Sequence, residues 1–218
     1  MATSNIRVYR DLMGENEKWA AKTREFLAAR HLTMLNLIGS PGSGKTTLLA
    51  SLVREAGAGG DFSVLEGDVE TTHDAERIAA LGIPVSQLLT NGACHLEAKL
   101  VHYALKDLPV RERGTVVVEN VGNLVCPAEF DIGEHAKVAV LSVTEGEDKP
   151  LKYPLLFREC KAVVLSKTDL LPHLRFDLAQ CREYIRQVHS SVPVFEVSAV
   201  SGAGVRELLH WVQNVNKG

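Results

Sequence analysis

The chain lacks several features that would assign it to a specialised class of protein. No apolar run approaches the ~20 residues that a membrane-spanning helix needs, and residues 1–22 contain no apolar signal core. The net charge of −3 gives no electrostatic reason to expect nucleic acid as a partner. There is also no internal repeat, low-complexity tract or interdomain linker. We therefore expect a cytoplasmic protein with neither a membrane nor a nucleic acid as its partner.

The composition is that of an ordinary globular domain. At 218 residues, with 45% hydrophobic and 23% charged residues, the chain can bury a sizeable core. We predict one domain over residues 1–218, with an amphipathic helix over about 15–30 packed on it. In a reducing compartment the four cysteines would be free thiols or metal ligands rather than disulfides.

The stretch MLNLIGSPGSGKTT, residues 34–47, contains a complete phosphate-binding motif. The segment Gly39–Thr46 matches G-x-x-x-x-G-K-[ST] between a short apolar strand and an amphipathic helix. Glycines let backbone N–H groups surround a phosphate, while Lys45 is expected to reach the β- and γ-phosphates and Thr46 to ligate Mg²⁺. The predicted nucleotide-binding residues here are Gly39, Gly42, Ser43, Gly44, Lys45, Thr46 and Thr47.

Strand-like and helix-like segments alternate along the chain, and several strands are continuous apolar runs. This pattern predicts an α/β fold, a three-layer P-loop NTPase with a mostly parallel sheet covered by helices on both faces. The strands are expected at 34–38, 62–66, 84–89, 115–119, 138–143, 162–165 and 194–197. Helices are expected at 15–30, directly after the phosphate loop, and at 72–81, 95–105, 176–188 and 205–215.

The segment S-K-T-D, residues 166–169, follows a strand and resembles the N-K-x-D guanine-recognition motif of GTP-binding proteins. The Asp169 carboxylate would accept hydrogen bonds from guanine, and the Lys167 stem would lie over the base. Ser198 and Ala199 resemble the second guanine-contacting loop. Ser166 replaces the asparagine that, in that family, helps to tie the base loop to the phosphate loop, and we expect this change to affect affinity more than base choice.

Two acidic residues are expected at strand ends on the ligand side of the sheet. Asp68 ends the second strand, and Glu119 opens an E-x-x-G segment in which Gly122 would sense the γ-phosphate. For Glu66 and Glu70 we expect solvated or capping roles. The predicted catalytic residues are Lys45, Asp68 and Glu119, and the predicted Mg²⁺ ligands are Thr46, Asp68 and Glu119.

Cys94, His95 and Cys126 form a second candidate metal site, because two thiolates and an imidazole suit Zn²⁺ or Ni²⁺. The alternative is three unrelated side chains, since free cysteine is often simply buried. Adjacent side chains in a regular helix diverge by ~100°, so Cys94 and His95 would bind one ion only with local distortion, or two ions shared with a second subunit. Three ligands also leave a tetrahedral site incomplete, which favours a dimer interface. Cys160 and Cys181 are read as core thiols.

Taken together, five segments resemble one known family. GSPGSGKTTLL, EGD, NGACHL, ENVGNLVCP and SKTDLLP occur in this order, and together they closely resemble the hydrogenase nickel-incorporation GTPases, the HypB family of SIMIBI-type P-loop proteins. The resemblance covers roughly residues 15–215. It implies a GTPase that converts GTP to GDP and phosphate and helps to deliver nickel to [NiFe]-hydrogenase. It further implies a GTP-dependent homodimer, Ni²⁺ or Zn²⁺ at Cys94, His95 and Cys126, and maturation accessory proteins and the hydrogenase large subunit as partners.

One departure and three alternatives accompany this resemblance. Some relatives carry an N-terminal cysteine motif or a histidine-rich tract, but here the first cysteine is Cys94 and no histidine run occurs, so nickel storage is not supported. A related GTPase could serve urease or a cobalamin-dependent mutase, although LVCP after ENVGN favours the hydrogenase branch. A P-loop small-molecule kinase is disfavoured by S-K-T-D and the paired cysteines. A passive zinc-stabilised module would leave the phosphate loop unexplained.

Overall fold

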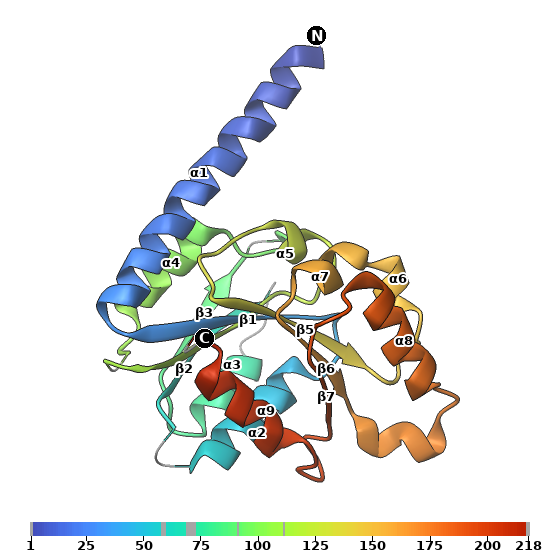
Figure 1. Cartoon of the computed structure of the whole chain (residues 1–218). Coiled ribbons are helices and arrows are strands. Elements are labelled where there is room, and N and C mark those ends of the chain that lie inside the picture. The colour runs from blue at the N-terminus through green and yellow to red at the C-terminus, as the bar shows by residue number, and fades with distance from the viewer. Residues whose placement is uncertain (1, 58–59, 69–72, 91, 111, 217–218) are drawn as a thin grey trace.

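The computed structural model describes residues 2–57, 60–68, 73–90, 92–110 and 112–216. Within those ranges the side chains of residues 2–13, 68, 73 and 74 lie outside the description. Figure 1 shows three layers, with a central sheet seen nearly edge-on between two layers of helices.

The sheet has seven strands in the order β3-β2-β4-β1-β5-β6-β7, and every pairing is parallel. This arrangement confirms the predicted α/β class, and each predicted strand is present with ends shifted by only a few residues. The strands are β1 (Leu32–Ile38), β2 (Phe62–Asp68), β3 (Val85–Leu89), β4 (Gly114–Glu119), β5 (Ala136–Ser142), β6 (Ala162–Ser166) and β7 (Val194–Val197).

Helices cover both faces of the sheet. One layer holds α2 (Lys45–Ala56), α3 (His73–Ala79) and α9 (Val205–Asn214), and the other holds α1 (Ala2–Ala29), α4 (Ala98–Asp107), α5 (Cys126–Glu129), α6 (Lys149–Lys152), α7 (Pro154–Glu159) and α8 (Leu178–Val188). A 3₁₀ helix, η2, spans Thr168–His173. Relative to the predictions, α1 begins at Ala2 rather than near residue 15, α4 begins at Ala98 rather than at His95, and α5, α6, α7 and η2 are additional.

The central strand β1 is buried on both sides because side chains alternate between the faces of a strand. Leu35 and Leu37 belong to the hydrophobic cluster under α2 and α9. Met34 faces the opposite layer and packs with residues of α1 and α4. A third cluster fills the space between β5, β6 and helices α5, α7 and α8. The strand that carries the phosphate loop is therefore held rigidly from both faces.

Helix α1 presents a narrow buried face to the body. Asn16, Ala20, Thr23 and Leu27 recur at intervals of three and four residues and are 0–8% exposed. Gly133 allows this close packing, since a Cβ there would lie 2.7 Å from the Ala20 carbonyl oxygen. The rings of Trp19 and Phe26 are half-buried at the edge of α4.

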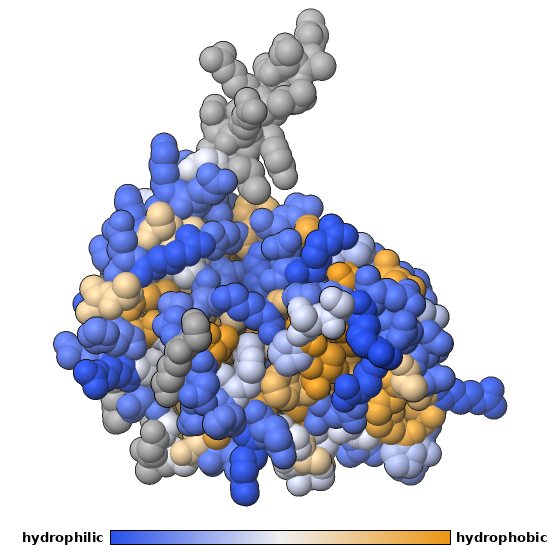
Figure 2. Space-filling view, viewed as in Figure 1, coloured by the Kyte–Doolittle hydropathy of each residue, from blue (hydrophilic) through white to orange (hydrophobic). Residues whose placement is uncertain are grey.

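Among the described residues, no helix combines the length and apolarity that crossing a membrane requires. Figure 2 shows hydrophilic residues over much of one face, with smaller hydrophobic areas between them. Exposed large apolar side chains include Leu89, Leu100, Tyr103 and Val125, which lie on or near the elements that flank Cys94.

Replacing Leu27 by alanine is expected to loosen α1 from the body. Its side chain is fully buried, and large-to-small changes at such positions cost about 2–5 kcal/mol in the free energy of unfolding. Urea unfolding measures this loss. Glu25→Ala, on the exposed side of the same helix, is the control and should change stability by less than about 0.5 kcal/mol. Equal effects of the two substitutions would contradict the docked position of α1.

Candidate nucleotide and metal sites

The phosphate loop connects β1 to α2 and has the backbone geometry that its glycines permit. Gly42 and Gly44 have φ values of 74° and 91°, in the left-handed region that favours glycine. Gly39 is equally constrained, since a Cβ there would lie 2.5 Å from the Val140 carbonyl oxygen. Lys45 Nζ folds back and donates to the carbonyl oxygens of Gly39 and Ser40 at 3.2 and 3.3 Å. The ammonium group is thus held inside the curl of the loop.

A cavity of about 490 Å³ opens beside this loop at the carboxyl ends of the strands. On its floor the Thr46 hydroxyl donates to Glu119 Oε1 at 2.8 Å, and both residues are buried. The cavity is lined by residues of the phosphate loop, of β2 and of the turn after β4, together with Arg77 and Lys167. The predicted magnesium residue Asp68 ends β2 at the same edge, but its side chain lies outside the described residues.

Two further charged residues, Glu66 and Arg77, line the cavity, although the sequence analysis did not place them there. Glu66 is only 3% exposed and lines the cavity beside the phosphate loop, so the expectation of a solvated side chain is wrong, while the capping role stays a prediction. Arg77 of α3 donates to the Thr47 hydroxyl at 3.4 Å. The signal for Glu66 was its place in β2 two residues before Asp68, because residues i and i+2 of a strand share a face. Glu70 lies outside the described residues.

The S-K-T-D segment contacts the phosphate loop directly. Ser166 Oγ donates to the Ser43 carbonyl oxygen at 2.6 Å, and Lys167 Nζ donates to the Gly42 carbonyl oxygen at 2.6 Å. Serine therefore ties the two loops together in place of asparagine. Lys167 adopts φ 60°, a left-handed conformation uncommon for lysine. Asp169 Oδ1 accepts a hydrogen bond from the Ser198 hydroxyl at 2.6 Å, which brings the two predicted guanine-contacting segments together.

The turn after β4 is pressed against the phosphate loop. A Cβ on Gly122 would lie 2.7 Å from Pro41 Cγ and 2.9 Å from Pro41 N, so only glycine fits there without displacement. Asn120 fixes the turn from inside, since its amide donates to Asn36 Oδ1 at 3.0 Å and accepts from the Val121 N–H at 3.0 Å. A movement of Pro41 in the phosphate loop would therefore act directly on the backbone of Gly122.

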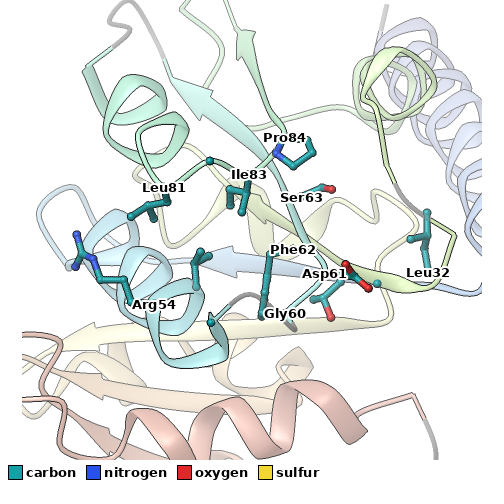
Figure 3. A pocket seen from close by; sticks show the side chains of 14 residues that line it. Leu32, Arg54, Gly60, Asp61, Phe62, Ser63, Leu81, Ile83 and Pro84 are labelled. Carbon is teal, nitrogen blue, oxygen red and sulfur yellow. The ribbon is translucent and has the colours of Figure 1, made fainter.

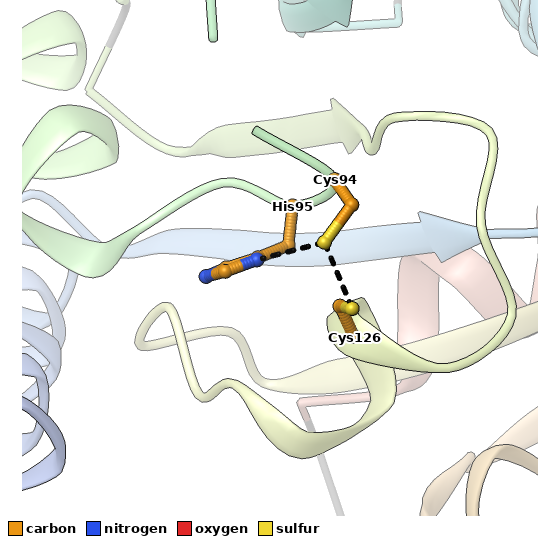
Figure 4. Close-up of side chains that lie close together, drawn as sticks. All are labelled: Cys94, His95 and Cys126. Atoms are coloured by element: carbon orange, nitrogen blue, oxygen red, sulfur yellow. Dashed lines mark hydrogen bonds between the residues drawn. The ribbon is translucent and has the colours of Figure 1, made fainter. Parts of the chain in front are cut away.

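Cys94, His95 and Cys126 come together as a compact cluster (Figure 4), with their ligand atoms all within 4.8 Å of one another. Cys94 and His95 precede α4, and Cys126 begins α5. The fully buried Leu96 anchors the first segment, since a Cβ on Gly67 of β2 would lie 2.8 Å from Leu96 Cδ1. Because Cys94 and His95 lie outside a helix, the divergence expected of helical neighbours does not apply.

The distances are close to those of a tetrahedral site. With metal–sulfur and metal–nitrogen bonds of about 2.3 and 2.05 Å, a cysteine sulfur and a histidine nitrogen on one zinc ion lie about 3.6 Å apart. The Cys94 Sγ to His95 Nδ1 distance is 3.6 Å. The two sulfurs lie 2.8 Å apart, about 1 Å closer than two thiolates on one ion. A small separation of the two sulfurs would therefore complete the fit.

Local environment sets the protonation of these groups. The hydrogen bond to Cys126, with burial second, raises the pKa of Cys94. Burial lowers the pKa of His95, against the opposing charges of Glu97 and Glu129, and neutral imidazole is the form that binds metals. Its ring stacks on Phe130 with centroids 3.8 Å apart. His95 Nε2 is buried and has no hydrogen-bond partner among the residues that the structure describes.

A second cavity, of about 560 Å³, lies at the opposite edge of the sheet, at the amino ends of β2 and β4 (Figure 3). Arg54, Asp61, Phe62 and Leu81 are among its lining residues. It is somewhat larger than the cavity beside the phosphate loop, but ligands of open α/β sheets bind at the carboxyl ends of the strands. We therefore take the smaller cavity as the candidate nucleotide site.

Comparisons with known proteins place the chain near one family. The family described as "CobW/HypB/UreG, nucleotide-binding domain" matches residues 33–196. The hydrogenase maturation factor HypB of Azotobacter vinelandii is 50% identical over 208 residues, which cover 95% of this chain and 69% of that protein. The crystal structure of HypB from Helicobacter pylori in complex with nickel has a TM-score of 0.88 and 34% identity, covering 93% of this chain and 96% of that one. HypB from Archaeoglobus fulgidus gives a TM-score of 0.86 at 31% identity, covering 93% and 98%.

The four thiols should differ sharply in reactivity. Burial raises the pKa values of Cys160 and Cys181 to about 12, so neither forms the nucleophilic thiolate near neutral pH. Cys94 is exposed and Cys126 half-buried. In the folded, metal-free protein an aromatic disulfide reagent should modify Cys94 and Cys126, and should reach the other two only after denaturation. Rapid modification of Cys160 or Cys181 in the folded protein, read by peptide mass, would contradict this assignment.

Proposed function

Because the chain belongs to the CobW/HypB/UreG nucleotide-binding family, we propose that it is a GTP-hydrolysing metallochaperone that helps to deliver nickel to [NiFe]-hydrogenase during maturation. The observation that carries this proposal is the single turn of residues 119–126, which lines the phosphate-loop cavity at one end and supplies Cys126 at the other. The names of the relatives and the nickel in the Helicobacter pylori structure support the same reading.

The phosphate end of the cavity fits a magnesium nucleotide. Oxygen ligands suit Mg²⁺, and the buried Thr46 hydroxyl and Glu119 carboxylate meet on the cavity floor. We propose that these two groups, with Asp68 at the end of β2, hold the ion, which would neutralise charge on the phosphates. Lys45 would exchange its bonds to Gly39 and Ser40 for phosphate oxygens. Lys45, Asp68 and Glu119 thus form the proposed hydrolytic set.

We propose that the guanine base binds beside this cavity, next to its lining residue Lys167 and against Asp169. Asp169 accepts from Ser198 through Oδ1, which leaves Oδ2 for the donors of the base. The Lys167 stem lies beside the loop, held through its ammonium group by Gly42. Ala199 follows Ser198 in the same loop. Adenine lacks the donors that this carboxylate would accept, so GTP rather than ATP is the proposed substrate.

The cluster of Cys94, His95 and Cys126 is the proposed cargo site for Ni²⁺, with Zn²⁺ as the competing ion. Its soft and borderline ligands suit both ions. Three protein ligands leave a tetrahedral metal site without its fourth ligand. The surface around the cluster is open, since Cys94 is exposed and Val125, beside Cys126, is 49% exposed. We propose that a second copy of the chain covers this surface when GTP is bound. The proposed partners beyond that are hydrogenase maturation accessory proteins and the hydrogenase large subunit.

The nucleotide assignment predicts two distinct defects. Lys45→Ala should abolish GTP hydrolysis, because the charge that meets the γ-phosphate is removed. Asp169→Asn should reduce the preference for GTP over ATP by about 1–3 kcal/mol, or roughly 5- to 150-fold in relative affinity, because the pairing with guanine is lost. Competition of both nucleotides against a fluorescent GDP measures the preference. Equal affinity of the unaltered protein for ATP and GTP would sink the guanine assignment.

The metal assignment predicts that only two of the thiols matter for binding. Cys94→Ala and Cys126→Ala should each weaken Ni²⁺ and Zn²⁺ binding by at least about tenfold, since one of three ligands is lost. Affinity should also fall as the pH drops, because the thiols must lose their protons to bind. Cys181→Ala is the matched control in a buried thiol. Isothermal titration of each variant gives stoichiometry and affinity, and unchanged values in Cys94→Ala would refute the site.

A further inference from the structure

Asn123 connects the two segments that carry the metal ligands. Its amide nitrogen Nδ2 donates to the Cys94 carbonyl oxygen at 3.2 Å, and its Oδ1 accepts from the Val125 N–H at 2.8 Å. One half-buried side chain therefore hydrogen-bonds the backbone of Cys94 and, at the same time, the segment that leads into Cys126. Both bonds use backbone groups directly beside the thiols.

Asn123 is also joined directly to the nucleotide site. It follows Gly122, which has no room for a Cβ against Pro41 of the phosphate loop. A ligand that shifts Pro41 or the turn of residues 119–122 must displace Asn123 as well. Such a displacement would move or break the hydrogen bond from Asn123 to the Cys94 carbonyl oxygen. This hydrogen bond connects the nucleotide site to Cys94, whereas the covalent chain connects Gly122 to Cys126.

A second asparagine braces the same two segments at their far ends. Asn16 of α1 accepts from the Ala98 N–H at 2.9 Å, at the start of α4, and donates to the Asp131 carbonyl oxygen at 2.7 Å, beyond α5. It is 8% exposed. Both of its partners lie outside the turn that touches the phosphate loop. Asn16 and Asn123 thus make comparable pairs of hydrogen bonds to the backbone, but only Asn123 adjoins the candidate nucleotide site.

We propose that Asn123 is the positioning residue through which the bound nucleotide sets the geometry of Cys94, and hence the metal affinity of the cluster. The proposal rests on the nucleotide and metal sites assigned above. The two sulfurs lie 2.8 Å apart, closer than two thiolates on one ion, so the cluster must open slightly to bind metal, by rotation of a thiol side chain or by a shift of the two segments. A turn that moves Asn123 controls this separation, while Asn16 holds the far ends fixed.

The experiment compares metal affinity in two nucleotide states. Ni²⁺ is titrated into the full chain saturated with Mg²⁺–GDP or with Mg²⁺ and the β,γ-imido analogue of GTP, and the readout is the ratio of the two dissociation constants. Asn123→Ala removes both hydrogen bonds. Asn123→Asp keeps the acceptor for Val125 N–H and removes the donor to Cys94. The negative charge that it adds acts in both states and largely cancels from the ratio. Asn16→Ala is the matched control.

In the unaltered protein the ratio should differ from one by at least about fivefold, the lower range of common coupling factors. Both Asn123 variants should bring it to within about twofold of one, with their GTP-analogue affinity retained. Asn16→Ala should weaken Ni²⁺ binding equally in both states and keep the ratio. Only a coupling role predicts this contrast, since a simple brace would alter affinity without altering the ratio.

Four outcomes would overturn the proposal. A ratio that survives in both Asn123 variants would show that the coupling bypasses this side chain. A ratio lost equally in Asn16→Ala would reduce Asn123 to a general brace. A ratio of one in the unaltered protein would remove the coupling itself, although the same titrations would still show both ligands bound and leave the proposed function standing. Absence of Ni²⁺ binding at the cluster would instead defeat the metal site, and the positioning role with it.

Discussion

The contact between Gly122 and Pro41 is the constraint on which the candidate site depends. The turn after β4 packs so closely on the phosphate loop that a single Cβ would lie 2.7 Å from proline. This approach is possible because β1 and β4 are adjacent and parallel, with Leu37 in register with Glu119. Both loops therefore leave the sheet at the same edge and at the same height. The contact between the phosphate loop and the turn that leads to Cys126 follows from that register.

The sequence predicted the parts of the fold that depend on local pattern. The phosphate loop and the seven strands were expected because glycine spacing and apolar runs are visible without coordinates. The clustering of Cys94, His95 and Cys126 was expected from the resemblance to the HypB family, since the residue types alone also allowed three unrelated side chains. The parallel sheet then places strand ends together at one edge, which explains why Thr46 and Glu119, far apart in the chain, meet at 2.8 Å. The roles assigned to these residues remain predictions.

Features that depend on tertiary contacts were missed, each for a physical reason. The buried position of Glu66 could not be read from charge, since burial of a carboxylate depends on what surrounds it. The late start of α4 follows from Leu96, whose contact with Gly67 in another strand draws residues 94–97 out of the helix. The hydrogen bond by which the Ser166 hydroxyl reaches the Ser43 carbonyl oxygen at 2.6 Å was not foreseen, and the expected effect of this serine on affinity stays a prediction. Asn16 and Asn123 gave no signal because their partners are backbone groups.

Asn16 also limits how α1 can sit on the molecule. Apolar faces tolerate sliding, because one methyl group can replace another, but an amide with two fixed backbone partners cannot be exchanged for its neighbours. A shift of one helical turn, about 5.4 Å, would bring Ala20 to that position and leave the Ala98 N–H and the Asp131 carbonyl unpaired. A buried asparagine with two fixed backbone partners thus specifies a single helix register, as a lone asparagine does in a coiled coil. A displacement of α1 along its axis would consequently be transmitted to the start of α4 through the Asn16–Ala98 hydrogen bond.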